Sequence, residues 1–76
     1  MNEKEQKERL ERIIRSYEGY IDSAIRCRDF DSAISWFYRM MGACHFAQSI
    51  GLIYVTYRKA ENDALFQRIL DAKYRG

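Results

Sequence analysis

The segment from residue 32 to residue 50 constrains the fold most, because its apolar side chains would cover more than half the circumference of a helix. Arg39 is its only charged residue. One broad face collects Phe30, Ala33, Ile34, Phe37, Met40, Met41, Cys44 and Ala47, and that face is widened by Trp36, Ala43 and Ile50. A helix this apolar is covered on more than one side. We therefore predict that it is the central element of the fold and ends before Gly51.

Residues 3–28 predict an amphipathic helix that precedes this segment. Asn2 is a candidate N-cap, with Glu5 three residues later as a capping-box partner. The apolar stripe consists of Leu10, Ile13, Tyr17, Tyr20, Ala24 and Cys27, widened by Ile14, Ile21 and Ile25. Residues 1–9 lack this stripe, so we expect them to protrude or fray. Asp29 or Asp31 caps the next helix after a short loop, which favours antiparallel packing.

Residues 52–74 are less regular, and two interpretations remain open. One face carries Leu52, Val55, Phe66, Ile69, Leu70 and Lys73, and nearly the opposite face carries Ile53, Tyr57, Ala60 and Ala64. Either this helix is used on both sides, or it breaks near residues 61–63 and restarts with Asn62 or Asp63 as the cap. Residues 52–57 also have strand propensity. A lone strand would have no ladder partner, so we favour helix there.

These elements predict a single domain over residues 1–76, an all-α antiparallel three-helix bundle. A core in a chain of this size supplies only about 3–5 kcal/mol, and small domains add disulfides, metals or oligomerisation. The two cysteines are too few for a disulfide framework. We therefore expect the bundle to dimerise, since a two-fold dimer is the commonest arrangement.

Charge and hydropathy exclude several classes of function. The 13 basic and 11 acidic residues are intermixed, without the basic stripe of a typical nucleic-acid binder. Residues 40–57 carry no formal charge, but they include too many polar residues for a membrane span, so we expect no membrane insertion. The N-terminus has no apolar signal region, and the cysteine content fits a reducing compartment. We therefore expect a cytoplasmic protein.

The sequence offers little for catalysis or metal binding. The soft metal ligands are Cys27, Cys44 and His45, whereas a structural zinc site needs four ligands. Cys44 and His45 are adjacent and would point about 100° apart on a helix. Both cysteines are better interpreted as small buried residues, and His45 as a residue at the edge of the core. No glycine-rich loop, nucleophile elbow or P-loop is present. We predict no enzyme activity, cofactor or small-molecule substrate.

The aromatic residues, 14% of the chain, exceed what one small core needs. Phe46 projects from the polar side of its helix, so it is either covered by another element or offered to a partner. We predict a partner-binding surface of Trp36, Tyr38, Arg39, Gly42 and Phe46, residue types that include those enriched at interfaces. The alternative is that the flanking helices bury these side chains.

The function predicted first is a non-enzymatic interaction module, a homodimer that regulates or inhibits another protein. Small helical proteins without motifs are common among the accessory proteins of phages and mobile elements. This chain resembles them in size and helical composition only, so we expect such an origin by analogy. The alternative is a nucleic-acid-binding adaptor that meets phosphates with Arg9, Arg12, Arg15, Arg58 and Lys59. A helix-turn-helix motif would place polar residues on the helix after the turn, and here that helix is the most apolar one.

Overall fold

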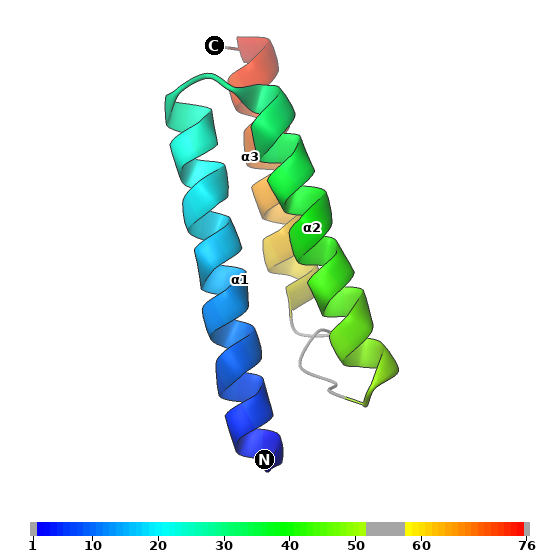
Figure 1. Cartoon of the computed structure of the whole chain (residues 1–76). Coiled ribbons are helices and arrows are strands. Elements are labelled where there is room, and N and C mark those ends of the chain that lie inside the picture. The colour runs from blue at the N-terminus through cyan, green and yellow to red at the C-terminus, as the bar shows by residue number, and fades with distance from the viewer. Residues whose placement is uncertain (1, 52–57, 76) are drawn as a thin grey trace.

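The computed structural model describes residues 2–51 and 58–75. Within these ranges the chain forms three α-helices and no strand: α1 (Glu3–Arg26), α2 (Phe30–Ser49) and α3 (Lys59–Arg75). Figure 1 shows α1 leading away from the N-terminus, α2 returning beside it, and α3 following behind the pair. The prediction of an all-α fold with three helices is confirmed. Residues 52–57, for which we favoured helix, lie outside the described residues.

The ends of α1 and α2 follow from capping residues that can be read in the sequence. Asn2 accepts a hydrogen bond from the backbone N–H of Glu5, at 2.8 Å, and so begins α1. Asp29 caps α2 by accepting hydrogen bonds from the backbone N–H of Ser32 at 3.2 Å and from its hydroxyl at 2.7 Å. Past the end of α2, Gly51 takes a φ of 90°, which suits glycine because it has no Cβ.

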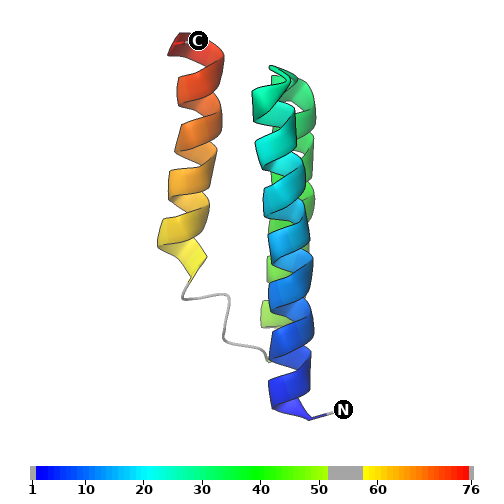
Figure 2. The ribbon, with the colours of Figure 1, turned by 90° about the vertical axis from the view of Figure 1, so that its left-hand side faces the viewer.

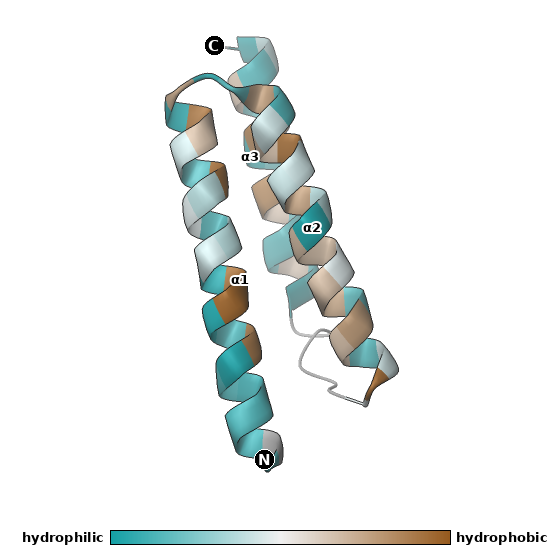
Figure 3. Ribbon diagram, viewed as in Figure 1, coloured by the Kyte–Doolittle hydropathy of each residue, from teal (hydrophilic) through white to brown (hydrophobic). Residues whose placement is uncertain are grey.

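The core is formed where α1 and α2 meet along their length, and α3 completes it. Its buried residues are Leu10, Ile14, Ile21 and Ala24 from α1, Ala33, Phe37, Met40, Cys44 and Ala47 from α2, and Leu65 and Ile69 from α3. The central face predicted for α2 is therefore confirmed at its buried positions. In Figure 3 the first turns of α1 are hydrophilic, and Leu10 is the first residue described as buried.

The interpretation with a break near residues 61–63 is wrong, because α3 runs through these positions without interruption. Asn62 and Asp63 do not cap a restarted helix. Asn62 is instead buried, with 4% of its surface exposed, and lies beside the thiol of Cys44 in the core. Asp63 accepts a hydrogen bond from Lys59 one turn earlier, at 3.1 Å. The polar triplet is therefore compatible with a continuous helix, since one member faces the core and the others face outwards.

The helix α3 packs on one side of the α1–α2 pair only. Figure 2 shows α3 beside the pair, with no described segment on the pair's other side. Arg58 lies 3.5 Å from Glu18 of α1, and Arg68 forms an ion pair with Asp22 one turn further along α1. The ring of Phe66 lies 4.9 Å from the ring of Phe37 of α2. These contacts define the covered side of the pair.

The buried stripe of α1 is narrower than the apolar stripe of its sequence. We expected Ile13, Tyr20 and Cys27 to be part of it, but all three are exposed. The buried positions are centred instead near Leu10, Ile14 and Ile21. The reason is that α3 packs on the flank that carries Glu18 and Asp22, which turns the Ile13 flank of α1 away from the core. The exposed apolar residues of α1 therefore lie on the side of the helix pair that no described segment covers.

A candidate interaction surface

The side of the α1–α2 pair opposite to α3 is called the hairpin face. Its position follows from helix geometry, since residues nine apart lie about 180° apart around a helix. Ile13 is nine residues from Asp22, which binds α3, and Phe46 is nine residues from Phe37, which also contacts α3. Both Ile13 and Phe46 therefore point away from α3. In Figure 1 this face is turned toward the viewer, because α3 lies behind the pair.

An apolar groove runs along the hairpin face between the two helices. Its lining consists of Gln6, Arg9, Leu10 and Ile13 from α1, and Ala43, Phe46, Ala47 and Ile50 from α2. Three large side chains of the groove are open to solvent: Ile13 is 47% exposed, Phe46 66% and Ile50 56%. None of the described residues that line it is acidic. The groove is thus an apolar surface with an arginine at its edge.

An aromatic cluster continues the groove toward the connection between the helices. The ring of Tyr20 lies 4.7 Å from the ring of Trp36, and the ring of Tyr17 lies 5.9 Å from that of Trp36. The guanidinium of Arg39 lies 4.9 Å from the centre of the indole ring. Tyr20 is 51% exposed, whereas Trp36 and Tyr17 are half-buried. Groove and cluster together present Arg, Trp and Tyr beside aliphatic side chains, the composition of interface hot spots.

The structure brings together only part of the predicted partner-binding set. Trp36, Arg39 and Phe46 belong to the hairpin face. Gly42 lies on the exposed surface of α2, and a Cβ built there would meet nothing within 4 Å. Tyr38 is exposed but lies on the other flank of α2, with its ring 6.3 Å from Phe66 of α3. The predicted set is therefore divided between two sides of α2.

The exposed apolar residues Ile13, Tyr20 and Ile50 of the hairpin face were not predicted as partner-binding, and Arg9 was predicted for nucleic acid only. For the three apolar residues the available signal was a seven-residue spacing. Gln6, Ile13 and Tyr20 repeat at this interval on α1, as do Trp36, Ala43 and Ile50 on α2. Residues seven apart lie on nearly the same side of a helix, so each series forms a stripe. The sequence indicated the stripes, but not which of their flanks α3 would cover.

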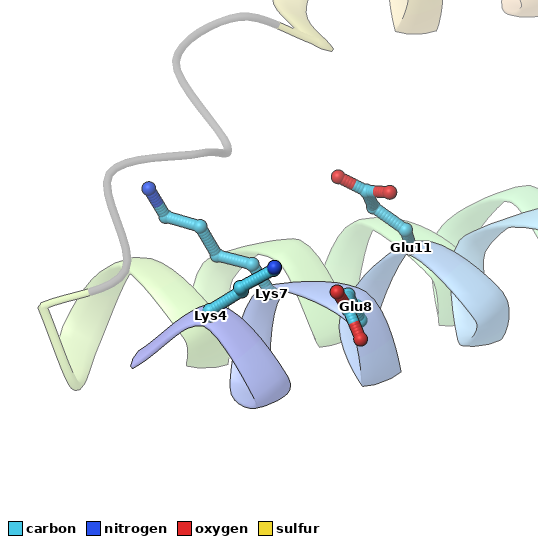
Figure 4. Close-up of a pocket in the computed structure, with 4 residues that line it drawn as sticks. All are labelled: Lys4, Lys7, Glu8 and Glu11. Carbon is cyan, nitrogen blue, oxygen red and sulfur yellow. The ribbon is translucent and has the colours of Figure 1, made fainter. Parts of the chain in front are cut away.

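A second hollow is formed by charged side chains and differs in character from the groove. It is lined by Lys4, Lys7, Glu8 and Glu11 near the beginning of α1. Figure 4 shows Lys7 and Glu11 projecting on the side of α1 on which α3 begins. Glu11 also lies 3.5 Å from Arg15. The acidic side chains of α1 from Glu8 to Asp22 are thus directed away from the groove.

The residues predicted to contact nucleic acid do not form one patch. Arg58 lies on the α3 side, where its side chain is largely buried and lies 3.5 Å from Glu18. Lys59 pairs with Asp63 at 3.1 Å, and Arg15 pairs with Glu11 at 3.5 Å. Arg9 lines the apolar groove, and Arg12 is exposed on α1. Three of the five cations are therefore engaged with carboxylates.

The two cysteines lie in different environments. Cys44 is buried, and burial raises the pKa of its thiol, although the charge of Arg58 and the side chain of Asn62 act in the opposite direction. Cys27 and His45 are both exposed, so the predictions of a buried Cys27 and of a core-edge His45 are wrong. Cys27 follows the last turn of α1, and His45 points outward from α2. Among the described residues, no three His, Cys, Asp or Glu side chains converge on a metal position.

The chain matches no protein-family model, no curated protein and no solved structure. Within residues 2–51 and 58–75, none of the helices combines the length and the hydropathy that a membrane crossing requires.

Proposed function

We propose that this chain is a non-enzymatic protein-interaction module that binds a partner protein through the hairpin face. The observation that carries the proposal is the exposure of Ile13, Tyr20, Phe46 and Ile50 on one side of the α1–α2 pair. Contiguous exposed apolar surface rimmed by polar residues marks sites of protein contact. The proposal assumes that the three helices pack as an antiparallel bundle. In this arrangement α3 covers one side of the α1–α2 pair and does not cover the hairpin face.

The composition of the face supports a specific contact. Aromatic residues and arginine are enriched at interface cores, and truncation of such anchors typically costs 2 kcal/mol or more of binding free energy. Trp36 contacts both Tyr20 and Arg39 within the chain, so its ring is already packed against neighbours without a partner. A preformed anchor loses little conformational entropy on binding. The module would regulate or inhibit its partner by occupying a surface that the partner needs.

Two occupants fit a function of this kind: a different protein, or a second copy of the chain in a homodimer. Both would cover the apolar groove. The alternative function, nucleic-acid binding, has less support because Arg15, Arg58 and Lys59 are paired with carboxylates.

The proposal is tested by comparing capture with two matched variants. Phe46→Asp places a charge in the groove, and Tyr74→Asp places the same charge on an exposed aromatic residue near the end of α3. Proteins retained from source-cell extract would be quantified by mass spectrometry, and the mass of each variant in solution would be measured. We expect the wild type and Tyr74→Asp to retain the same partner, or the same dimer, and Phe46→Asp to lose it. Equal capture and equal mass for all three chains would contradict the proposal.

A further inference from the structure

The hairpin face has a charge pattern that distinguishes between its possible occupants. On the hairpin face Arg9 lines the groove, and Arg39 stacks on Trp36. Arg12 is exposed on the adjoining flank of α1, one turn from Arg9. The acidic residues Glu18 and Asp22 are turned to the opposite side, where Glu18 pairs with Arg58, just before α3, and Asp22 pairs with Arg68 of α3. The open side of the hairpin is therefore apolar with a positive margin.

The carboxylates nearest to this face lie at its two ends. Glu5 is exposed one turn before Arg9, near the beginning of α1. Asp29 lies at the connection between the helices, where its carboxylate is engaged by the backbone and hydroxyl of Ser32. Within residues 2–51 and 58–75 neither of these carboxylates forms an ion pair with Arg9 or Arg39, so both arginines can pair with carboxylates on the molecule that covers the face.

This pattern does not favour a second copy as the occupant. Two hairpin faces related by a two-fold axis would present the same arginines to each other, and none of the lining residues that the structure describes supplies a carboxylate. Like charges placed against each other across an interface cost several kcal/mol. An occupant with carboxylates beside its apolar stripe would instead pair with Arg9 and Arg39 while its apolar side chains fill the groove.

The shape of the face indicates which secondary structure it accepts. The groove and the aromatic cluster extend from Gln6 to Tyr20 along α1, a helical rise of about 21 Å at 1.5 Å per residue. A groove between two helices receives a third helix, whose residues at i, i+3, i+4 and i+7 act as anchors. Four turns of helix match this length.

From these observations we infer that the partner contributes an amphipathic helix of about four turns, whose apolar stripe is flanked by Asp or Glu. The apolar stripe packs into the groove against Ile13, Phe46 and Ile50, and the flanking carboxylates pair with Arg9 and Arg39. This inference rests on the proposed function, because it requires the hairpin face to be the binding surface. It goes further by selecting an acidic helix over a second copy of the chain.

The test uses two designed peptides of four helical turns with the same leucine stripe, one flanked by Glu and the other by Lys. Each carries a fluorescein label, and its binding to the full chain is followed by fluorescence anisotropy at low salt. We expect the Glu peptide to bind at least about tenfold more tightly than the Lys peptide, with a preference that weakens as salt is added. The single tryptophan, Trp36, provides a second readout, since its emission shifts to shorter wavelength when a helix covers it.

Two double variants with the same change in net charge separate local pairing from overall charge. Arg9→Glu with Arg39→Glu removes the positive margin and should invert the preference between the peptides. Arg15→Glu with Arg75→Glu changes exposed arginines outside the face and should leave the Glu peptide preferred. Circular dichroism of each variant verifies that the helices are retained.

Three other outcomes would overturn the inference. The first two leave the proposed function standing, and the third contradicts both. If both peptides bind equally and Phe46→Asp abolishes binding, the face binds helices without acidic preference. If the chain sediments as a dimer that Phe46→Asp dissociates, the occupant is a second copy. If neither peptide binds, and Phe46→Asp alters neither the mass of the chain nor its capture of a partner, the proposed function fails with the inference.

Discussion

The ring of Tyr20 lies 4.7 Å from the ring of Trp36 and joins α1 to α2 beside the groove of the hairpin face. This pair links the fold to its proposed function, because its two rings hold the helices together while half of Tyr20 remains open to solvent. Aromatic pairs contribute about 0.5–1.5 kcal/mol beyond the area they bury. We expect Tyr20→Ala to lower the free energy of unfolding by at least that amount, because the buried area of the ring is lost as well, and Tyr74→Ala to change it by less than about 0.5 kcal/mol. Urea titration followed by circular dichroism measures both, and equal effects would contradict the stacking.

Two isoleucines of α1 form a matched pair for testing which side of this helix is buried. Ile21 has no exposed surface, and Ile13 is 47% exposed on the hairpin face. Ile21→Ala should destabilise the chain by about 2–5 kcal/mol, because it leaves a cavity in the core. Ile13→Ala should cost less than about 1 kcal/mol, because its side chain is half in water already. Thermal melts of the two variants provide the comparison. A larger loss for Ile13→Ala would mean that α3 packs on the other side of the hairpin.

The cap of α2 predicts a dependence of stability on acid. Hydrogen bonds from the hydroxyl and backbone N–H of Ser32 lower the pKa of Asp29 below its ordinary value of 3.8. A carboxyl with a depressed folded-state pKa stabilises the fold above its unfolded-state pKa, and this contribution is lost as the pH falls through the folded-state value. We therefore expect the melting temperature to decrease below about pH 4. Asp29→Asn caps without titrating, so its melting temperature should fall less steeply over the same range. An equal slope in both chains would exclude Asp29 as a source of the acid sensitivity.

The two thiols should react at very different rates. Cys27 is exposed, whereas Cys44 is buried with a raised pKa, so little reactive thiolate is present at Cys44 at neutral pH. We expect one thiol to be labelled rapidly by a maleimide in the native chain, and Cys27→Ser to abolish this fast phase. Cys44→Ser should retain it. Labelling in denaturant provides the reference, since both cysteines then react. Fast labelling of Cys27→Ser in the native state would show that the core around Cys44 opens readily.

Two glycines with different backbone conformations provide a direct test of the fold. A Cβ at Gly19 would meet nothing within 4 Å, so Gly19→Ala should stabilise α1 by about 0.5–1 kcal/mol. Gly51 has the same open surroundings but a φ of 90°, so Gly51→Ala is strained and should be destabilising. The two melting temperatures should therefore move in opposite directions. A shift of both in the same direction would contradict the assigned conformations.

Much of the fold can be predicted because its signals are local. Asn2, Asp29 and Gly51 determine their helix ends through contacts within three or four residues, and the sequence shows such residues directly. The buried face of α2 follows from periodicity for the same reason. By contrast, the exposure of Ile13 depends on which flank α3 covers, and the ion pairs that orient α3 connect residues distant in the sequence. One of the two interpretations made Asn62 or Asp63 a cap because both residue types favour that role, but tertiary packing buries Asn62 inside a continuous helix.

The same distinction between local signals and tertiary packing explains which residues of the candidate site could be predicted. Trp36 and Phe46 were predicted because the aromatic residues exceed what one core needs, and Arg39 because arginine is enriched at interfaces. All three lie on the hairpin face. Tyr38 was predicted from the same aromatic excess but lies on the α3 side of α2. The number of aromatic residues does not indicate on which side of a helix each one lies. Tyr20 was assigned to the core because its stripe is apolar. The geometry of three packed helices was needed to show that this stripe is only partly covered.

The central claim is that the hairpin face binds a partner, and amide hydrogen exchange tests it most directly. Exchange would be measured along the chain, alone and with the acidic four-turn peptide or the captured partner bound. The account predicts slower exchange on binding in residues 6–20 of α1 and 36–50 of α2, with the outer surface of α3 unchanged. Protection confined to α3, or no change in α1 and α2 when the partner is bound, would contradict it.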